Sequence, residues 1–168
     1  VVGMAGILDT SRFKYFLAKE LNISIKEIDT LVLGGHGDFM VPMPNRTTIG
    51  KKPLKEFISQ KKISTENLEN IVDRTRKGGA EIIKLLEKGS AFYAPASSGV
   101  EMAESYLKNQ KKVLPCAAFL NGEYGVKNLY AGVPVVIGEN GVEKIEQIDL
   151  DEKEKKEFMH SIDAVKSL

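Results

Sequence analysis

The hydrophobic and polar positions along the chain predict long helices first of all. Apolar residues recur at helical spacing over residues 9–21, and again over residues 64–87, the longest periodic segment. Ser64 is a suitable N-cap for the second helix. The Gly78-Gly79 pair predicts a kink, or a point of close packing, in its middle. One face of this helix is expected to carry Leu68, Ile71, Val72, Thr75, Gly79, Ile82 and Leu86.

Two further helices are predicted in the second half of the chain. One spans about 98–108, and an amphipathic helix spans 151–168. Asp151 and Glu154 have the spacing of a capping box at the start of the terminal helix. Its expected apolar face consists of Phe158, Ile162 and Val165.

Short apolar runs between the helices predict strands. They cover residues 31–33, 112–119, 133–138 and 142–148, and Glu139-Asn140-Gly141 is a hairpin-turn signal between the last two. Residues 41–49 contain two prolines, which favours an edge strand or irregular ribbon. Strands and helices do not alternate regularly, so we predict a single α+β domain over residues 1–168, with mixed or antiparallel strands packed against long helices.

Composition narrows the classes of partner. The 168 residues are 42% hydrophobic and 28% charged, with a net charge of +1, which is typical of a globular protein. This balance gives no electrostatic reason to expect nucleic acid or membrane as a partner. Cys116 cannot form an internal disulfide, so we expect a buried small hydrophobe and a reducing, cytoplasmic location.

The two histidines differ in their surroundings. His160 lies in the charged terminal helix and is expected at the surface. His36 follows a predicted strand and has glycines at 34, 35 and 37, which allow a sharp turn and close approach of a ligand. The pattern fits either an imidazole presented to a substrate or an ordinary glycine turn that contains a histidine.

Few other residues are candidates for a chemical role. Asp9 and Arg12 are three positions apart and share a helix face, either as a surface ion pair or as a functional pair. The glycines around His36 do not form a dinucleotide-binding loop, because Met40 stands where the third glycine is required. Two distant histidines and one cysteine give no zinc spacing, so we predict no metal site.

Several segments, in order, resemble the lactate/malate dehydrogenase family. The segment Leu8–Phe13 resembles the family's L-D-[ST]-x-R-F motif, and Gly34–Pro42 resembles its catalytic histidine loop. Residues 76–82, 89–96 and 120–125 also match, so the resemblance covers essentially the whole chain. It implies the C-terminal, substrate-binding domain of that family, with no NAD-binding Rossmann domain in this chain.

The resemblance also implies roles for matched residues. His36 would be the acid–base residue, and Asp9 would hydrogen-bond its imidazole and raise its pKa. Arg12 would clamp a substrate carboxylate. Ser90 and Ala91 would belong to the substrate pocket, and Pro95 would face the nicotinamide of NAD.

The implied substrate is a small dicarboxylate, malate or oxaloacetate, because lactate enzymes commonly carry Glu where Gly35 stands. Lactate or another 2-hydroxy acid is the alternative, as is a non-catalytic oligomerisation module. The family implies a dimer or tetramer. The family usually has a basic and then an aromatic residue where Asn45 and Arg46 stand. Without a nucleotide-binding half, we expect the chain alone to be inactive.

Overall fold

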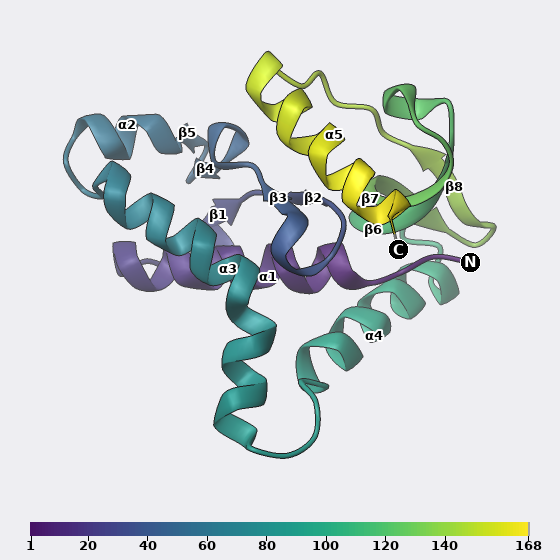
Figure 1. Cartoon of the computed structure of the whole chain (residues 1–168), viewed down its shortest axis with the longest axis horizontal. Helices are drawn as coiled ribbons and strands as arrows, with labels where there is room; N and C mark the ends of the chain where they lie inside the picture. Colours follow the sequence, from purple (N-terminus) through teal and green to yellow (C-terminus); the bar gives the residue numbers. More distant parts are fainter. Residues whose placement is uncertain (168) are drawn as a thin grey trace.

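In the computed structural model, which describes residues 1–167, long helices surround an antiparallel sheet (Figure 1). The α-helices are α1 (Ala5–Leu21), α2 (Leu54–Ser59), α3 (Thr65–Leu86), α4 (Tyr93–Leu107) and α5 (Glu152–Lys166). The strands are β1 (Ile28–Asp29), β2 (Val32–Gly34), β3 (Met40–Pro42), β4 (Thr48–Ile49), β5 (Lys52–Pro53), β6 (Lys112–Asn121), β7 (Lys127–Gly138) and β8 (Gly141–Ile145). Short 3-10 helices are η1 (Ile25–Glu27), η2 (Gly37–Phe39), η3 (Pro44–Arg46) and η4 (Glu123–Gly125).

The main sheet has the order β3-β2-β7-β6, and β8 also pairs with β7. Every pairing in it is antiparallel. A second, smaller sheet joins β1, β4 and β5. This arrangement confirms the predicted α+β class. The proline-containing segment 41–49 is predicted to be an edge strand or irregular ribbon. Only its start lies in the edge strand β3; η3 follows, and its last two residues form β4, the middle strand of the smaller sheet.

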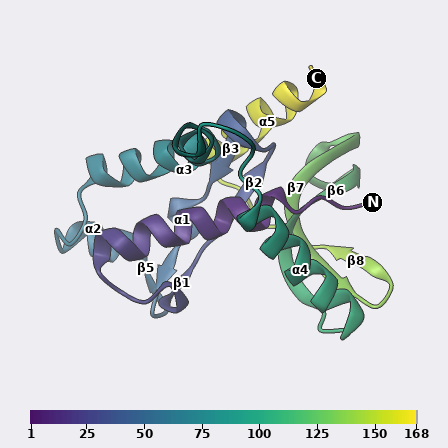
Figure 2. The same ribbon diagram turned by 90° about the horizontal axis from the view of Figure 1, so that it is seen from below.

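Helix α1 runs from the main sheet, at its N-terminal end, to α2 and the smaller sheet, at its C-terminal end (Figure 2). One hydrophobic cluster lies between the main sheet and α5, and the other joins α1 to α2 and α3. Phe13 and Leu17 of α1 are fully buried in the second cluster, while Ile7 belongs to the first. The helix begins at Ala5 rather than residue 9, so Asp9 lies one turn inside it and is buried.

Helix α3 begins as predicted, with the Ser64 hydroxyl accepting a hydrogen bond from the Asn67 amide at 3.0 Å. It changes direction along its length (Figures 1 and 2). The predicted apolar face is therefore buried only in its first half. Leu68 and Ile71 are buried, whereas Leu86 is 47% exposed. Of the glycine pair, Gly78 is buried and Gly79 is partly exposed.

Other element boundaries also differ from the prediction. Helix α4 begins at Tyr93 instead of residue 98, and β7 begins at Lys127 instead of residue 133. Strand β8 ends at Ile145 rather than 148. Helix α5 has the expected capping box between Asp151 and Glu154, and the last predicted residue of this helix, 168, lies outside the described residues.

Candidate active site

The turn that carries His36 is built by glycine backbone geometry. Strand β2 ends at Gly34, where φ is +82°, and η2 begins at Gly37, where φ is +83°. Both values lie in the left-handed region, which glycine adopts without a Cβ clash. Gly34 also pairs with Gly132 of β7, and a Cβ on Gly132 would lie only 2.6 Å from the Gly34 carbonyl oxygen. Close strand approach and the sharp turn together project His36 from the end of β2.

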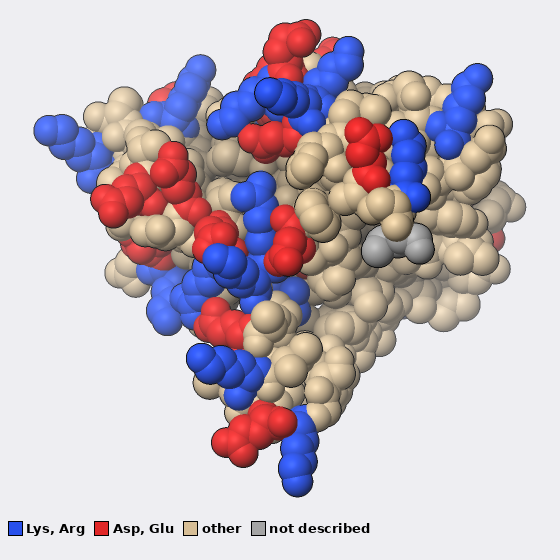
Figure 3. All heavy atoms as spheres, viewed as in Figure 1, with Lys and Arg blue, Asp and Glu red and all other residues tan. Residues whose placement is uncertain are grey.

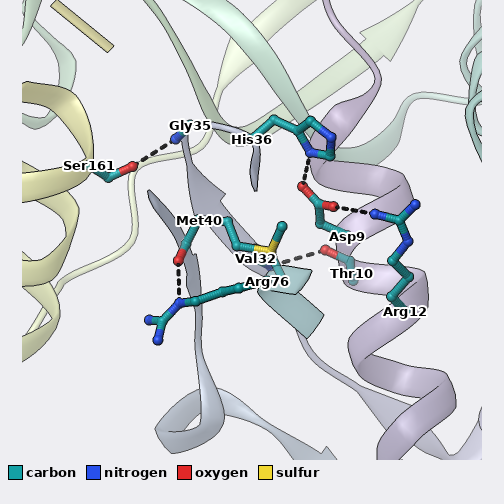
Figure 4. A network of polar contacts seen from close by, with 9 residues as sticks. All are labelled: Asp9, Thr10, Arg12, Val32, Gly35, His36, Met40, Arg76 and Ser161. Atoms are coloured by element: carbon teal, nitrogen blue, oxygen red, sulfur yellow. Dashed lines mark hydrogen bonds and ion pairs between the residues drawn. The ribbon is translucent and has the colours of Figure 1, made fainter. Parts of the chain in front are cut away.

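His36 is paired with Asp9 of α1 (Figure 4). Its Nδ1 lies 2.8 Å from Asp9 Oδ2. A carboxylate only accepts hydrogen bonds, so Nδ1 carries the proton and Nε2 is the nitrogen left for other chemistry. The hydrogen bond to Asp9 raises the pKa of His36 above 6.5, against the opposing effect of partial burial.

The two partners differ in exposure. The Asp9 side chain is 2% exposed, whereas that of His36 is 50% exposed. Asp9 is therefore fixed inside the protein while the imidazole faces outward. A buried carboxylate that orients a half-exposed imidazole is an arrangement suited to proton transfer with a bound molecule.

Arg12 lies on the other side of Asp9. Its Nη1 donates a long hydrogen bond of 3.4 Å to Asp9 Oδ1. The side chain is 11% exposed, and within residues 1–167 its buried Nε has no hydrogen-bond partner. Nε itself is enclosed, so the donors available to an anionic ligand are those of the terminal Nη atoms, of which only Nη1 makes a hydrogen bond among residues 1–167. The structure thus brings Asp9, Arg12 and His36 together, as the sequence predicts.

Helix α1 is joined to β2 by a further contact. The buried Thr10 hydroxyl accepts a hydrogen bond from the Val32 amide at 3.0 Å. Thr10 is next to Asp9, and Val32 begins the strand that leads to His36. This contact therefore fixes the alignment of α1 with β2, and so the position of Asp9 relative to His36.

Glycine also makes room for Arg12 on the neighbouring helix. A Cβ on Gly78 of α3 would lie 3.1 Å from Arg12 Cδ and 3.4 Å from Arg12 Nε. At Gly79 the nearest Arg12 atom would be 3.8 Å away, an ordinary contact distance. Gly78 is thus the member of the pair on which the position of Arg12 depends, a role that the glycine pair alone did not predict.

A cavity of about 320 Å³ lies beside His36 and Asp9. Its walls come mainly from small apolar residues of α1, β6, β7 and α5, including Ala5, Ala117, Gly132 and Val165. Phe39 of η2 closes part of it. The imidazole thus lies next to an apolar space as well as facing the exterior.

The other predicted site residues lie elsewhere. Ser90 and Ala91 are in the connection between α3 and α4, and Pro95 is in the first turn of α4. None of them lines the cavity beside His36. The roles that the resemblance implies for these three residues stay predictions.

The remaining sequence predictions about single residues can be compared with their places in the fold. His160 is exposed on α5, and its ring lies 5.7 Å from that of Phe39. Cys116 is fully buried, which raises its thiol pKa to about 12 and confirms the interpretation as a core residue.

Among residues 1–167, no group of His, Cys, Asp and Glu is arranged to hold a metal ion. None of the helices within this range combines the length and apolarity that a bilayer crossing requires.

Known proteins resemble this chain in both sequence and architecture. Residues 7–168 match the family described as lactate/malate dehydrogenase, alpha/beta C-terminal domain. The chain is 71% identical over all 168 residues to a malate dehydrogenase of Pelagibacter ubique (strain HTCC1062), and it spans 52% of that protein.

Two solved structures also resemble it. Malate dehydrogenase of Cryptosporidium parvum superposes with a TM-score of 0.97 at 44% identity, over 99% of this chain and 53% of that one. Lactate dehydrogenase of Eimeria maxima, solved with NADH and oxamate, gives 0.97 at 43%, over 99% of this chain and 50% of that one. The chain thus spans about half the length of these relatives. It belongs to the lactate/malate dehydrogenase family, of which it forms the α/β C-terminal domain.

Proposed function

We propose that this chain is the substrate-binding and acid–base half of an NAD-dependent malate dehydrogenase, which interconverts malate and oxaloacetate. The observation that carries the proposal is the 2.8 Å contact between His36 Nδ1 and the buried Asp9 carboxylate. It fixes the tautomer that leaves Nε2 free to exchange a proton with the substrate. The 71% identity to a malate dehydrogenase supports the same activity.

The proton step follows from this geometry. In malate oxidation, neutral His36 accepts the hydroxyl proton at Nε2 as the C–O bond becomes a carbonyl. Asp9 then stabilises the imidazolium through the Nδ1 hydrogen bond. In oxaloacetate reduction the imidazolium returns that proton to the forming hydroxyl. NAD, when bound, accepts or supplies the hydride that balances the reaction.

Arg12 provides the anchor for a substrate carboxylate. Its donors are held close to Asp9 but are not saturated by it, because the one contact between them is 3.4 Å long. A carboxylate bound in two parallel hydrogen bonds would fix the reacting carbon relative to His36. Malate or oxaloacetate, each a small dicarboxylate, offers such a group.

The coenzyme would be held mainly outside this chain. The sequence contains no strand–G-x-G-x-x-G–helix unit, so a phosphate cradle must come from the half of the family architecture that the chain does not span. The exposed side of His36 leaves its Nε2 open to a nicotinamide and substrate presented from there. Pro95 is the residue of this chain that we propose faces the nicotinamide, with Ser90 and Ala91 facing the substrate.

Malate is favoured over lactate by the residue at position 35, since lactate enzymes commonly carry glutamate where Gly35 stands. A Cβ on Gly35 would lie 2.8 Å from Val165 Cγ2, so a larger residue here would require the Val165 side chain to move. Lactate or another 2-hydroxy acid is the alternative substrate, since the solved relatives include lactate dehydrogenases.

An assembly function is the second candidate, and the surface of α4 favours it. Tyr93, Val100 and Leu107 of this helix are 83%, 66% and 78% exposed. Figure 3 shows charged side chains gathered over α2, α3 and α5, while the surface over α4 is largely uncharged. Apolar residues exposed together mark a surface that another one covers. We propose that this face packs in a homo-oligomer of the complete dehydrogenase, which functions in the cytoplasm.

A chimera tests the proposed function. The chain would replace the matching half of the Pelagibacter ubique malate dehydrogenase, and oxaloacetate reduction would be followed by NADH consumption. We expect turnover by the chimera and negligible turnover by the 168-residue chain alone, because catalysis requires both reactants to be positioned. A well-folded chimera that binds NADH but does not turn over oxaloacetate or pyruvate would contradict the proposal. Turnover by the isolated chain would contradict the half-site description.

A further inference from the structure

The turn that carries His36 is held from a second side by helix α5. The Gly35 amide donates a hydrogen bond to Ser161 Oγ at 2.8 Å, across 126 positions of sequence (Figure 4). Ser161 is fully buried. Because Gly35 immediately precedes His36, this bond fixes the peptide from which the imidazole extends.

The fit between the turn and α5 is close. A Cβ on Gly34 would overlap Ser161 Oγ and lie 2.9 Å from Ser161 Cβ. The end of the turn is in contact with the same helix, since the Phe39 ring lies edge-on to His160 at 5.7 Å. Two consecutive residues of α5 therefore contact the His36 turn at its beginning and at its end.

Helix α5 is itself firmly anchored. Arg46 donates two hydrogen bonds to Glu154, from Nε at 3.1 Å and from Nη2 at 3.0 Å. Glu154 also accepts from the Asp151 amide in the capping box, and Phe158 and Ile162 are buried in the core. A helix fixed at its start and along its inner face is a rigid support for the Gly35 amide.

We propose that Ser161 is a positioning residue of the dehydrogenase reaction, which fixes the Gly35 amide and through it the approach of His36 to Asp9. The proposal rests on the proposed function for its kinetic consequence. Its geometric part, the constraint on the turn, is independent of which reaction the protein catalyses. The Ser161 hydroxyl is bonded to the Gly35 amide and not to the imidazole, so it acts through the backbone.

The test compares Ser161→Ala with Ser105→Ala in the chimera with the Pelagibacter half. Ser105 of α4 is the control, because it is fully buried and also accepts from a backbone amide, that of Lys112 at 3.2 Å; its hydroxyl donates to the Ile137 carbonyl at 2.7 Å. We expect Ser161→Ala to lower kcat roughly 10- to 100-fold with KM nearly unchanged, because a small misplacement of the acid–base group slows proton transfer. Ser105→Ala should leave both constants near those of the parent.

A second readout follows the histidine directly. Loosening of the turn should weaken the hydrogen bond to Asp9, so the His36 pKa measured by NMR should fall in Ser161→Ala and not in Ser105→Ala. Equal loss of stability in the two variants, with kcat and the His36 pKa unchanged in both, would overturn the proposal. It would leave Ser161 with a structural role only.

Hydrogen exchange in the unsubstituted protein keeps the proposal testable even if Ser161→Ala does not fold. The Gly35 amide lies in a partly exposed turn beside an exposed histidine, so without its partner it should exchange quickly. Protection comparable to that of the β2 amides is the expected result, and rapid exchange would overturn the proposal. If the chimera lacks turnover but Gly35 is protected and the His36 pKa responds to Ser161→Ala, the proposed function fails while the positioning by Ser161 stands.

Discussion

The His36 turn and the α3–α4 segment, which runs from the end of α3 to the first turn of α4, carry the two groups of predicted site residues, and they are built very differently. Around His36 the supporting residues are buried, as Leu8, Val32 and Leu33 show at 2% exposure or less. In the α3–α4 segment, large apolar side chains face outward, with Leu85, Phe92 and Tyr93 exposed by 76%, 57% and 83%. The first region is held by contacts within this chain, and the second has few of them.

The two regions therefore depend to different degrees on the rest of the protein. The polar contacts between α1, β2 and α5 position His36 without any group outside the chain. The segment with Ser90, Ala91 and Pro95 has no comparable support among residues 1–167. We infer that the acid–base pair is preformed here, and that the second region takes its working geometry from surfaces contributed by other parts of the protein.

The largest expected effect is that of replacing His36, the proposed acid–base residue. His36→Gln in the chimera should lower kcat by about 10²- to 10⁴-fold, which is the usual contribution of general acid–base catalysis. Assembly and thermal stability should stay close to those of the parent, because half of the side chain is exposed. Steady-state kinetics with size-exclusion chromatography measure both, and unchanged turnover would favour the assembly function.

The next effect concerns Arg12, the proposed substrate anchor. Arg12→Lys keeps the positive charge but removes the planar pair of donors, so KM for oxaloacetate should rise by roughly 10- to 100-fold, as expected for a lost charged hydrogen bond of about 1.5–3 kcal/mol. A rise in KM no larger than that of a substitution on the exposed face of α3, such as Lys77→Arg, would count against the anchoring role.

A smaller effect is expected where α3 makes room for Arg12. Gly78→Ala should raise KM by about fivefold, since overpacking of roughly 1 kcal/mol displaces the guanidinium. Gly79→Ala is the matched control, because its Cβ would have only ordinary contacts with Arg12. Parallel kinetics on the two variants distinguish a local clash from a general change in the helix. Equal KM values for both would show that Gly78 does not set the Arg12 position.

The smallest effect should be found in the exposed region. Tyr93→Ala in the 168-residue chain should change the free energy of unfolding by no more than about 0.5 kcal/mol, as surface substitutions usually do. Urea denaturation of parent and variant measures this. A loss of several kcal/mol would mean that the α3–α4 segment is packed within this chain, and that it does not differ from the His36 turn in its internal support.

Local signals in the sequence predicted much of this structure. The helical spacing in α1 and α3 and the caps at Ser64 and Asp151 act over a few residues, so they can be recognised without tertiary information. Helix α4 begins at Tyr93, five residues before the predicted start at 98, and Pro95 lies in its first turn. Proline is tolerated in a first helical turn, where its missing amide has no partner to lose.

Features that depend on distant contacts could not be predicted. The first half of β7 contains Lys127, Asn128 and Gly132, and its strand conformation comes from pairing with β6. Likewise, the motifs predicted Asp9, Arg12 and His36, but Ser161 gave no signal, since its partner Gly35 is 126 positions away. Gly78 was noticed only as half of a pair, and its contact with Arg12 became evident from the packing of α3 on α1.

Asp9 and His36 are proposed to form a preorganised acid–base pair within this chain, and an NMR pH titration of His36 measures that pair. Because the hydrogen bond to Asp9 raises the His36 pKa, the imidazole should stay protonated to a pH above 6.5, and oxaloacetate reduction should decline as pH rises through that pKa. Asp9→Asn should lower the His36 pKa. A His36 pKa at or below 6.5 in the parent, or one that does not respond to Asp9→Asn, would mean that the two residues do not form this pair.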